Sequence, residues 1–173
     1  MNDVTGPPDR LSIFSTGVEF FVTPELQIAD AWSVALDYSL LINSRTIDGS
    51  AGRWEFTSQT QLPTAMVHYL VGGSGYWLKA GGGLGYHWMT LRERFVTVGS
   101  ETDFTASGIG LKLDAVANTA FDSHLLGSVA VELRWSSLGT LRAANGSPLQ
   151  YLGREVNMDF YSAGVKFGLT YQL

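Results

Sequence analysis

The sequence predicts an all-β protein, an antiparallel up-and-down β-barrel formed as a single domain by residues 1–173. The first observation is the final stretch, 159–173, in which apolar residues alternate with small or polar ones. A period of two indicates an extended strand with one apolar and one polar face. The second is that the same pattern recurs along the chain in segments longer than the roughly five or six residues of ordinary strands. The third is composition, with 20 glycines, 12% aromatic residues and only 16% charged residues.

The predicted elements follow from alternation and its interruptions. Seven strands are expected at 11–23, 32–45, 54–71, 76–94, 104–121, 125–141 and 159–173. Residues 1–10 contain two prolines and no alternation, so they are predicted as loop. Pro63 cannot donate a hydrogen bond to a ladder, so we expect a bulge or the edge of a membrane there.

The predicted connections alternate in length. Residues 24–31 form a turn region. Later connections are short at 72–75 and 122–124, and longer at 46–53, 95–103 and 142–156. Short turns on one side and longer loops on the other are typical of bacterial outer-membrane barrels.

Composition excludes several classes of protein and site. The chain has no cysteine, which excludes disulfides and thiolate metal sites. It has no run of 18 or more apolar residues, which excludes a transmembrane helix. Its net charge of −5 argues against a nucleic-acid partner.

The two faces of the strands indicate which side lies outside. A soluble, lipocalin-like barrel would show the same period with its apolar face inside. Here the polar face is rich in small residues such as Gly81, Gly83 and Gly85, which suit a narrow lumen filled by side chains. No charge falls on the apolar face, and its aromatic residues form two bands. The expected girdles comprise Phe20, Tyr69, Tyr76, Phe121 and Tyr171 near the short turns, and Phe14, Tyr86, Trp88, Trp135 and Tyr161 farther away. These features favour a transmembrane barrel.

The segment TAMVHYLVGGSGYWLKAGGGLGYHW, followed by the alternating C-terminal strand, resembles the small outer-membrane β-barrels of the outer-membrane protein A and opacity-protein type. The resemblance implies eight strands, a bacterial outer-membrane location and contact with outer-membrane lipid. It also implies recognition by the barrel-assembly machinery through 159–173. The chain departs from the family in ending with Leu173, where phenylalanine is common, and in showing seven strands.

The odd strand count leads to a further expectation. Seven strands leave the first and last parallel, whereas bacterial single-chain barrels have an even number of antiparallel strands. We therefore expect an upstream first strand, preceded by the signal peptide that is absent from this sequence.

Charged residues on the polar faces are the main candidates for an interior site. They are Glu19, Asp37, Lys79, Lys112, Asp114, Glu132, Arg134 and Lys166. A tight 122–124 turn places Asp114 opposite Glu132 and Lys112 opposite Arg134. Opposite charges then meet on the diagonals, Asp114 with Arg134 and Lys112 with Glu132, and Glu132 can also reach Lys166. This set is interpreted as an ion-pair plug, with an ion path as the alternative.

No catalytic, metal or cofactor site is predicted. His68 and His87 lack a carboxylate at ligand spacing, and the glycines at 81–85 lack the phosphate-loop pattern. Asp122, Ser123 and His124 are consecutive in a turn and cannot converge as a triad. We expect a structural role or binding through the outer loops. The alternatives are a narrow channel, a lipid-modifying barrel enzyme with a serine and histidine at its rim, and a soluble ligand-binding barrel.

Overall fold

The computed structural model describes residues 17–49, 52–73, 75–151 and 153–172, and the statements below concern these residues. The predicted loop at 1–10 lies outside the described residues. So do the first six positions of the predicted strand 11–23, which include Phe14 of the predicted girdle. The strands are β1 (Gly17–Val22), β2 (Glu25–Ala29), β3 (Trp32–Gly49), β4 (Gly52–Gly73), β5 (Tyr76–Phe95), β6 (Ser100–Ala120), β7 (Leu125–Thr140), β8 (Arg142–Ala143), β9 (Gln150–Tyr151), β10 (Arg154–Glu155) and β11 (Asn157–Tyr171). The described part of the chain contains no helix that is long and apolar enough to cross a membrane.

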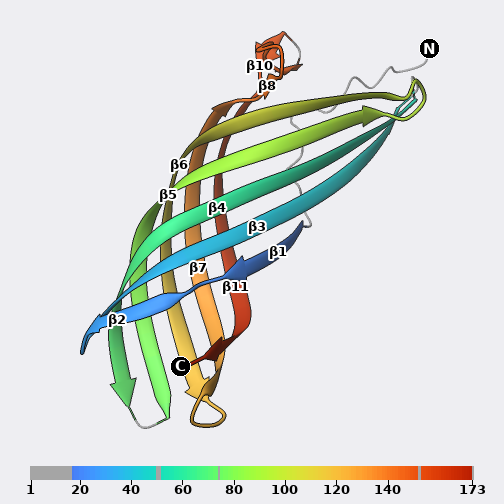
Figure 1. Ribbon diagram of the computed structural model, residues 1–173. Helices are drawn as coiled ribbons and strands as arrows, with labels where there is room; N and C mark the ends of the chain where they lie inside the picture. The colour runs from blue at the N-terminus through green and yellow to red at the C-terminus, as the bar shows by residue number, and fades with distance from the viewer. Residues whose placement is uncertain (1–16, 50–51, 74, 152, 173) are drawn as a thin grey trace, which may run out of the picture.

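Seven strands form a curled antiparallel sheet in the order β1-β3-β4-β5-β6-β7-β11, which makes a half-barrel (Figure 1). β2 and β8 join this sheet beside β3 and β6, and β9 and β10 form a separate two-stranded sheet. The up-and-down antiparallel order is confirmed. The short turns after β4 and β6 lie at the same end as the C-terminus, here called the turn end; the opposite end is the loop end. Within the described residues no ladder joins β1 to β11, so the predicted closed barrel is only partly formed.

The predicted turn at 24–31 is wrong, because five of its residues form β2. β2 continues the line of β1 along β3, where Glu25 pairs with Ala35 and Leu26 with Val34. Pro24 lacks an N–H but its carbonyl accepts the Leu36 N–H at 3.0 Å, so the chain stays attached to β3. The alternation in β2 is too short to show in the sequence.

The predicted loops at 46–53 and 95–103 are also too long. β3 and β4 stay paired out to Gly49 and Gly52, and β5 pairs with β6 out to Phe95 and Ser100. In these outer parts of the strands both faces carry polar residues, so alternation fades although the ladder continues.

Pro63 causes no bulge. The register between β4 and β5 is the same on both sides of it, with Gln61 opposite Trp88 and Thr64 opposite Gly85. On its other side Pro63 pairs with Tyr38 of β3. The missing donor is therefore accommodated without an extra residue.

The predicted long loop at 142–156 contains three short strands. β8 pairs with β6 at Phe104 and Thr105, and β9 pairs with β10. The Leu141 N–H donates to the Val156 carbonyl at 3.1 Å, and the Leu149 N–H donates to the Leu141 carbonyl at 2.8 Å. The loop thus folds back over the sheet at the loop end.

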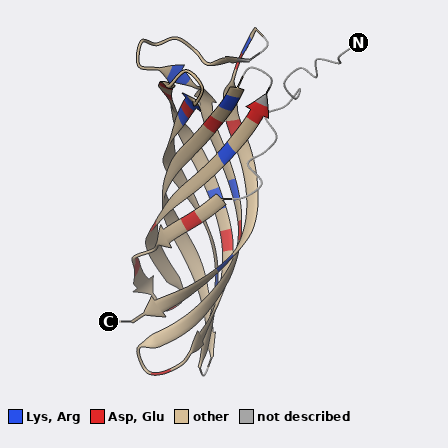
Figure 2. Ribbon diagram, turned by 90° about the vertical axis from the view of Figure 1, so that its right-hand side faces the viewer, with Lys and Arg blue, Asp and Glu red and all other residues tan. Residues whose placement is uncertain are grey.

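The sheet has two sections of opposite polarity. Toward the loop end its concave face carries a buried apolar cluster: Met89, Leu91, Phe104, Ala106, Leu138 and Leu141. There the convex face carries charges such as Arg92 and Asp103. Toward the turn end the convex face is apolar and the concave face is charged. Figure 2 shows charged positions in the middle of the sheet and toward the loop end, and few near the turn end.

Candidate functional site

Glu132 lies at the centre of a charge network on the concave face. Its carboxylate is 3.1 Å from Lys112 Nζ, 3.0 Å from Arg134 Nη2 and 3.0 Å from Lys166 Nζ. The side chains of Lys112 and Glu132 are 3% and 5% exposed. One carboxylate thus contacts three cations that come from β6, β7 and β11, of which Lys112 and Arg134 are buried and Lys166 is 11% exposed.

Two further carboxylates complete the central network from the other side of the half-barrel. Asp37 of β3 lies 2.9 Å from Lys112 Nζ. Glu19 of β1 lies 3.1 Å from Arg134 Nη2 and 2.6 Å from Lys166 Nζ. At this level each charge on the concave face has an opposite charge within 3.1 Å, which offsets the cost of isolated buried charge. Arg134 and Glu132 are ion-paired, but among the described residues Arg134 Nε and Glu132 Oε2 make no hydrogen bond of their own.

The register places Asp114 opposite Glu132 and Lys112 opposite Arg134, as the sequence predicts. Of the two expected diagonal pairs, the contact between Lys112 and Glu132 forms. Asp114 instead contacts His68 Nε2 at 3.1 Å and lies 3.9 Å from Lys112 Nζ, while Arg134 turns toward Glu132 and Glu19. The departure arises because His68 of β4 reaches Asp114 past Gly81, which is paired with both, and because Glu19 of β1 reaches Arg134. Pairing between neighbouring strands does not reveal either contact.

A second group, nearer the turn end, holds the remaining predicted charge, Lys79. Its ammonium pairs with Glu25 of β2. Glu25 also accepts a hydrogen bond from the Ser33 hydroxyl, and its carboxylate lies 3.5 Å from His68 Nδ1. Sequence reasoning missed Glu25, because β2 was predicted as turn. It placed His68 on the polar face of its strand but interpreted the residue as a lone histidine without a carboxylate partner.

His87, Ser136 and Thr64 form a third, uncharged group on the concave face. His87 Nδ1 lies 2.7 Å from Ser136 Oγ, and Nε2 lies 3.2 Å from Thr64 Oγ1. A serine beside a histidine is the core of many nucleophilic sites. Here the three residues are 0–1% exposed, and both ring nitrogens are occupied by hydroxyls. Within the described residues both ring nitrogens of His87 contact hydroxyls rather than a carboxylate, and the group is closed off from solvent.

Glycines on β5 and β6 make room for the two interior imidazoles. A Cβ on Gly81 would lie 2.3 Å from His68 Cδ2, and one on Gly110 would lie 1.9 Å from His87 Cε1. Since real Cβ atoms do not approach so closely, these positions require glycine for the rings to lie flat against the sheet. The excess of glycine on the polar face is thus explained by large side chains opposite it.

The convex face toward the turn end is an apolar band. Leu84, Leu113, Val131 and Phe167 are 67%, 60%, 53% and 76% exposed. The predicted aromatic residues within the described chain also lie on this side. Phe20, Tyr69, Tyr76, Tyr86, Phe121, Tyr161 and Tyr171 are exposed, while Trp88 and Trp135 are half-buried. Among the described residues, no charged side chain interrupts the band.

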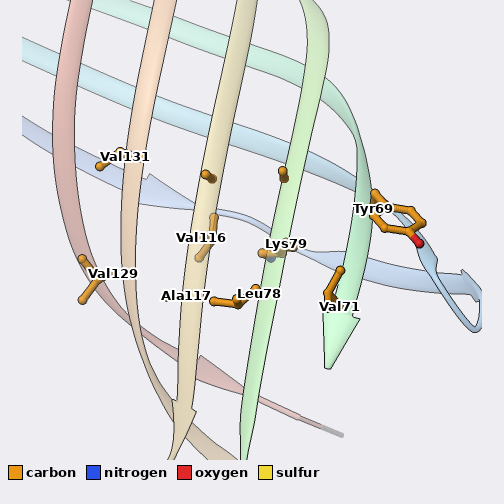
Figure 3. Close-up of a pocket in the computed structure, with 10 residues that line it drawn as sticks. Tyr69, Val71, Leu78, Lys79, Val116, Ala117, Val129 and Val131 are labelled. Atoms are coloured by element: carbon orange, nitrogen blue, oxygen red, sulfur yellow. The ribbon is translucent and has the colours of Figure 1, made fainter. Parts of the chain in front are cut away.

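Two shallow depressions mark the band where small residues lie between large ones. One, of about 450 Å³, is lined by Tyr69, Val71 and Leu78 around Ala80 and Ala115 (Figure 3). The other, of about 1050 Å³, lies around Ala65 and Gly82 between Leu84, Leu113 and Trp135. Both are open to the outside and lined mostly by apolar residues.

Exposed charges mark the two ends of the half-barrel. At the loop end Arg92 donates to both Asp103 oxygens at 2.8 and 3.2 Å, which holds the pKa of Asp103 below its usual value and raises that of Arg92. At the turn end the backbone N–H groups of His124 and Leu125 donate to Asp122 at 2.7 and 2.8 Å, and they lower the pKa of its carboxyl. Asp122 thus stabilises a tight turn.

Comparison with known proteins adds no family to this description. No protein-family model matches the chain, and no curated protein matches it. In the described residues no group of three or more histidine or carboxylate side chains is placed to hold a metal ion. The arrangement itself therefore carries the functional argument.

Proposed function

We propose that the chain is an integral β-barrel protein of a bacterial outer membrane, with its convex apolar band in contact with lipid. The observation that carries the proposal is the reversal of polarity along the sheet. Toward the turn end, charges lie inside and leucine, valine and aromatic residues lie outside; toward the loop end the order is the usual one of soluble proteins. A soluble protein does not expose a contiguous apolar surface of this extent.

The height of the band fits a membrane. On β5 the exposed aromatics Tyr76 and Tyr86 bound the band and are ten residues apart. Ten residues at about 3.3 Å each, tilted by about 40°, rise about 25 Å, which matches the apolar band of outer-membrane barrels. A sheet rather than a helix also suits such a span, because its ladders satisfy backbone groups where water is absent.

The interior supports a plugged, non-conducting barrel. Glu132 and its three cations fill the lumen at one level, and the buried apolar cluster around Met89 and Leu141 fills it toward the loop end. Ions would have to displace paired charges and then cross an apolar layer. Since the buried Ser136 and His87 pair has no access, the role is structural or one of binding through the outer hairpins rather than catalytic.

The outer hairpins provide the surface for such binding. β3, β4, β5 and β6 extend as long paired strands to the loop end (Figure 1). At the tips of their hairpins Trp54 stacks on Phe95 with ring centroids 4.5 Å apart. Aromatic side chains are enriched at protein contact surfaces, which supports a binding role for these hairpins.

The proposal is tested by refolding the urea-denatured chain in plain buffer, in detergent micelles and in lipid vesicles. Circular dichroism and protease resistance should report a stable β-structure only with detergent or lipid. A monomeric, protease-resistant protein in plain buffer would refute the membrane assignment. Planar-bilayer recording then tests the plug: a sustained conductance would overturn it and favour the channel.

A further inference from the structure

His68 of β4 lies buried between two carboxylates that come from different strands. Its Nε2 atom is 3.1 Å from the Asp114 carboxylate of β6, and its Nδ1 atom is 3.5 Å from the Glu25 carboxylate of β2. The His68 side chain is 1% exposed, and that of Asp114 is 9% exposed. Both ring nitrogens thus face an anion, and the ring connects β2 with β6.

The backbone of the sheet allows the ring to reach β6 across β5. His68 pairs with Gly81 of β5, and Gly81 pairs with Asp114 of β6, so the three residues form one row across the sheet. A Cβ on Gly81 would lie 2.3 Å from His68 Cδ2. Because glycine has no Cβ, the imidazole passes over the backbone of β5 and contacts Asp114 directly.

Either neutral form of the His68 ring leaves one of these contacts unfavourable. A neutral imidazole has one N–H donor and one lone-pair acceptor, whereas an ionised carboxylate only accepts. With the proton on Nε2, the lone pair of Nδ1 faces Glu25; with the proton on Nδ1, the lone pair of Nε2 faces Asp114. Only the imidazolium, with a proton on both nitrogens, attracts both carboxylates.

Lys112 does not replace this positive charge beside Asp114. Its Nζ lies 3.9 Å from Asp114 but is closer to Asp37 and Glu132, at 2.9 and 3.1 Å. Three carboxylates therefore share one ammonium, and Asp114 lies nearer to His68 than to Lys112. The charged groups that face the ring, directly or through Lys112, are Glu25 of β2, Asp37 of β3, Lys79 of β5, Lys112 and Asp114 of β6, and Glu132 of β7.

β2 is attached to the sheet by a short ladder and by the Glu25 side chain. The ladder with β3 runs from Glu25 to Ala29, and its register shifts between Gln27 and Ala29. The Glu25 carboxylate turns inward, where it pairs with Lys79 and accepts a hydrogen bond from Ser33. Together with the contact to the imidazole, this side chain ties β2 to β3, β4 and β5.

We propose that His68 is a protonated latch, an imidazolium that ties Glu25 of β2 to Asp114 of β6, so that loss of its proton releases β2 from the interior of the sheet. The latch is closed while the ring is charged, and it opens when the pH rises far enough to remove the proton. It uses interior contacts alone, so it does not depend on the proposed membrane location.

Nitrogen-15 NMR of the histidine rings tests the protonation state directly, in whichever medium holds the folded protein. At neutral pH both ring nitrogens of His68 should give the signals of protonated nitrogen. His87 is the internal comparison, because its nitrogens face the hydroxyls of Ser136 and Thr64, and its ring should carry one proton. A neutral ring at His68, with the proton on either nitrogen, would overturn the proposal.

A pH titration then tests the release of β2. As the pH rises, the backbone amide resonances of Leu26 and Gln27 should shift with the same midpoint as the loss of the His68 ring proton. His68→Gln keeps Lys79 but removes the ring, so a shift that persists at that midpoint in this variant belongs to the lysine and contradicts the latch. Amides of β2 that stay fixed while His68 titrates would contradict it as well.

Glu25→Gln removes the β2 end of the latch and leaves the ring in place. The ring should still titrate, but the amides of Leu26 and Gln27 should no longer follow it. Glu155→Gln is the matched control, because that carboxylate is exposed at the loop end and should leave the response of β2 unchanged. Amides that follow His68 equally in the two variants would overturn the proposal, and this comparison holds even if His68→Gln does not fold.

Discussion

Replacing Glu132 by glutamine tests the interior charge network most sharply, because the change removes one charge and keeps the shape. Glu132 contacts Lys112, Arg134 and Lys166 at 3.0–3.1 Å. With Lys112 and Glu132 only 3% and 5% exposed, solvent cannot screen the cations that are left behind. Removing one partner of a buried pair costs about 3–5 kcal/mol, and we expect Glu132→Gln to destabilise the protein by that amount.

A double-mutant cycle separates the pair from its surroundings. Lys112→Met removes the facing cation while keeping its apolar stem, so the double variant should cost less than the sum of the two single changes. The expected coupling is about 1–3 kcal/mol, measured by urea unfolding in micelles. The exposed pair of Arg92 and Asp103, changed to glutamine and asparagine, is the matched control, and its coupling should be near zero because solvent screens it. Equal coupling in the two cycles would refute the buried network.

Three further predictions follow from single positions. Val131→Lys should lower the free energy of unfolding in lipid vesicles by about 2–4 kcal/mol if the residue lies near the membrane midplane. Thr105→Lys, which is also on the convex face but in the loop-end section, should be tolerated. Equal losses of stability in the two variants would contradict a lipid-facing band. Gly110→Ala should lower the free energy of unfolding by about 1–3 kcal/mol, because the added Cβ overpacks the buried His87 ring. Gly164→Ala should not destabilise the protein, because its Cβ would meet nothing closer than 3.9 Å. Equal unfolding midpoints for the two variants would contradict this account. Because the folded pKa of Asp122 is lowered, its contribution is present above the unfolded value of about 3.9 and is lost as pH falls through the folded pKa. Asp122→Ala should therefore destabilise the protein at neutral pH and show a weaker loss of stability on acidification.

The strands of the half-barrel could be predicted because alternation is strong wherever one face is apolar. β5 and β11 are the clearest cases. Prediction failed where this contrast disappears. β2 presents only Leu26 and Ile28 outward after a proline. Residues 46–49 at the outer end of β3 hold a single apolar residue, Ile47, so the pattern there does not show that pairing continues.

The interior site could be predicted only within neighbouring strands. The register between β6 and β7 follows from one tight turn, and it places Lys112 beside Glu132. The contacts of Glu25 with Lys79, and of His87 with Ser136, join strands that are not neighbours in the sheet. Such contacts depend on the curvature of the whole sheet and on glycines that let the rings fit, which no local pattern contains.

The expectation of an upstream first strand stays a prediction. In the described residues no ladder joins β1 to β11, and both strands run toward the turn end, so a strand that paired antiparallel with both would run toward the loop end.

The central claim is that the convex face of the band meets lipid while the concave face does not. Adjacent residues of β7 offer a direct comparison, since Val131 is 53% exposed on the convex face and Ala130 lies on the concave face. Each is replaced by cysteine, labelled with a small fluorophore and refolded into vesicles that contain lipids brominated along the acyl chain. Strong quenching at position 131 and little at position 130 is the predicted result; equal quenching at the two positions, or stronger quenching at 130, would contradict it.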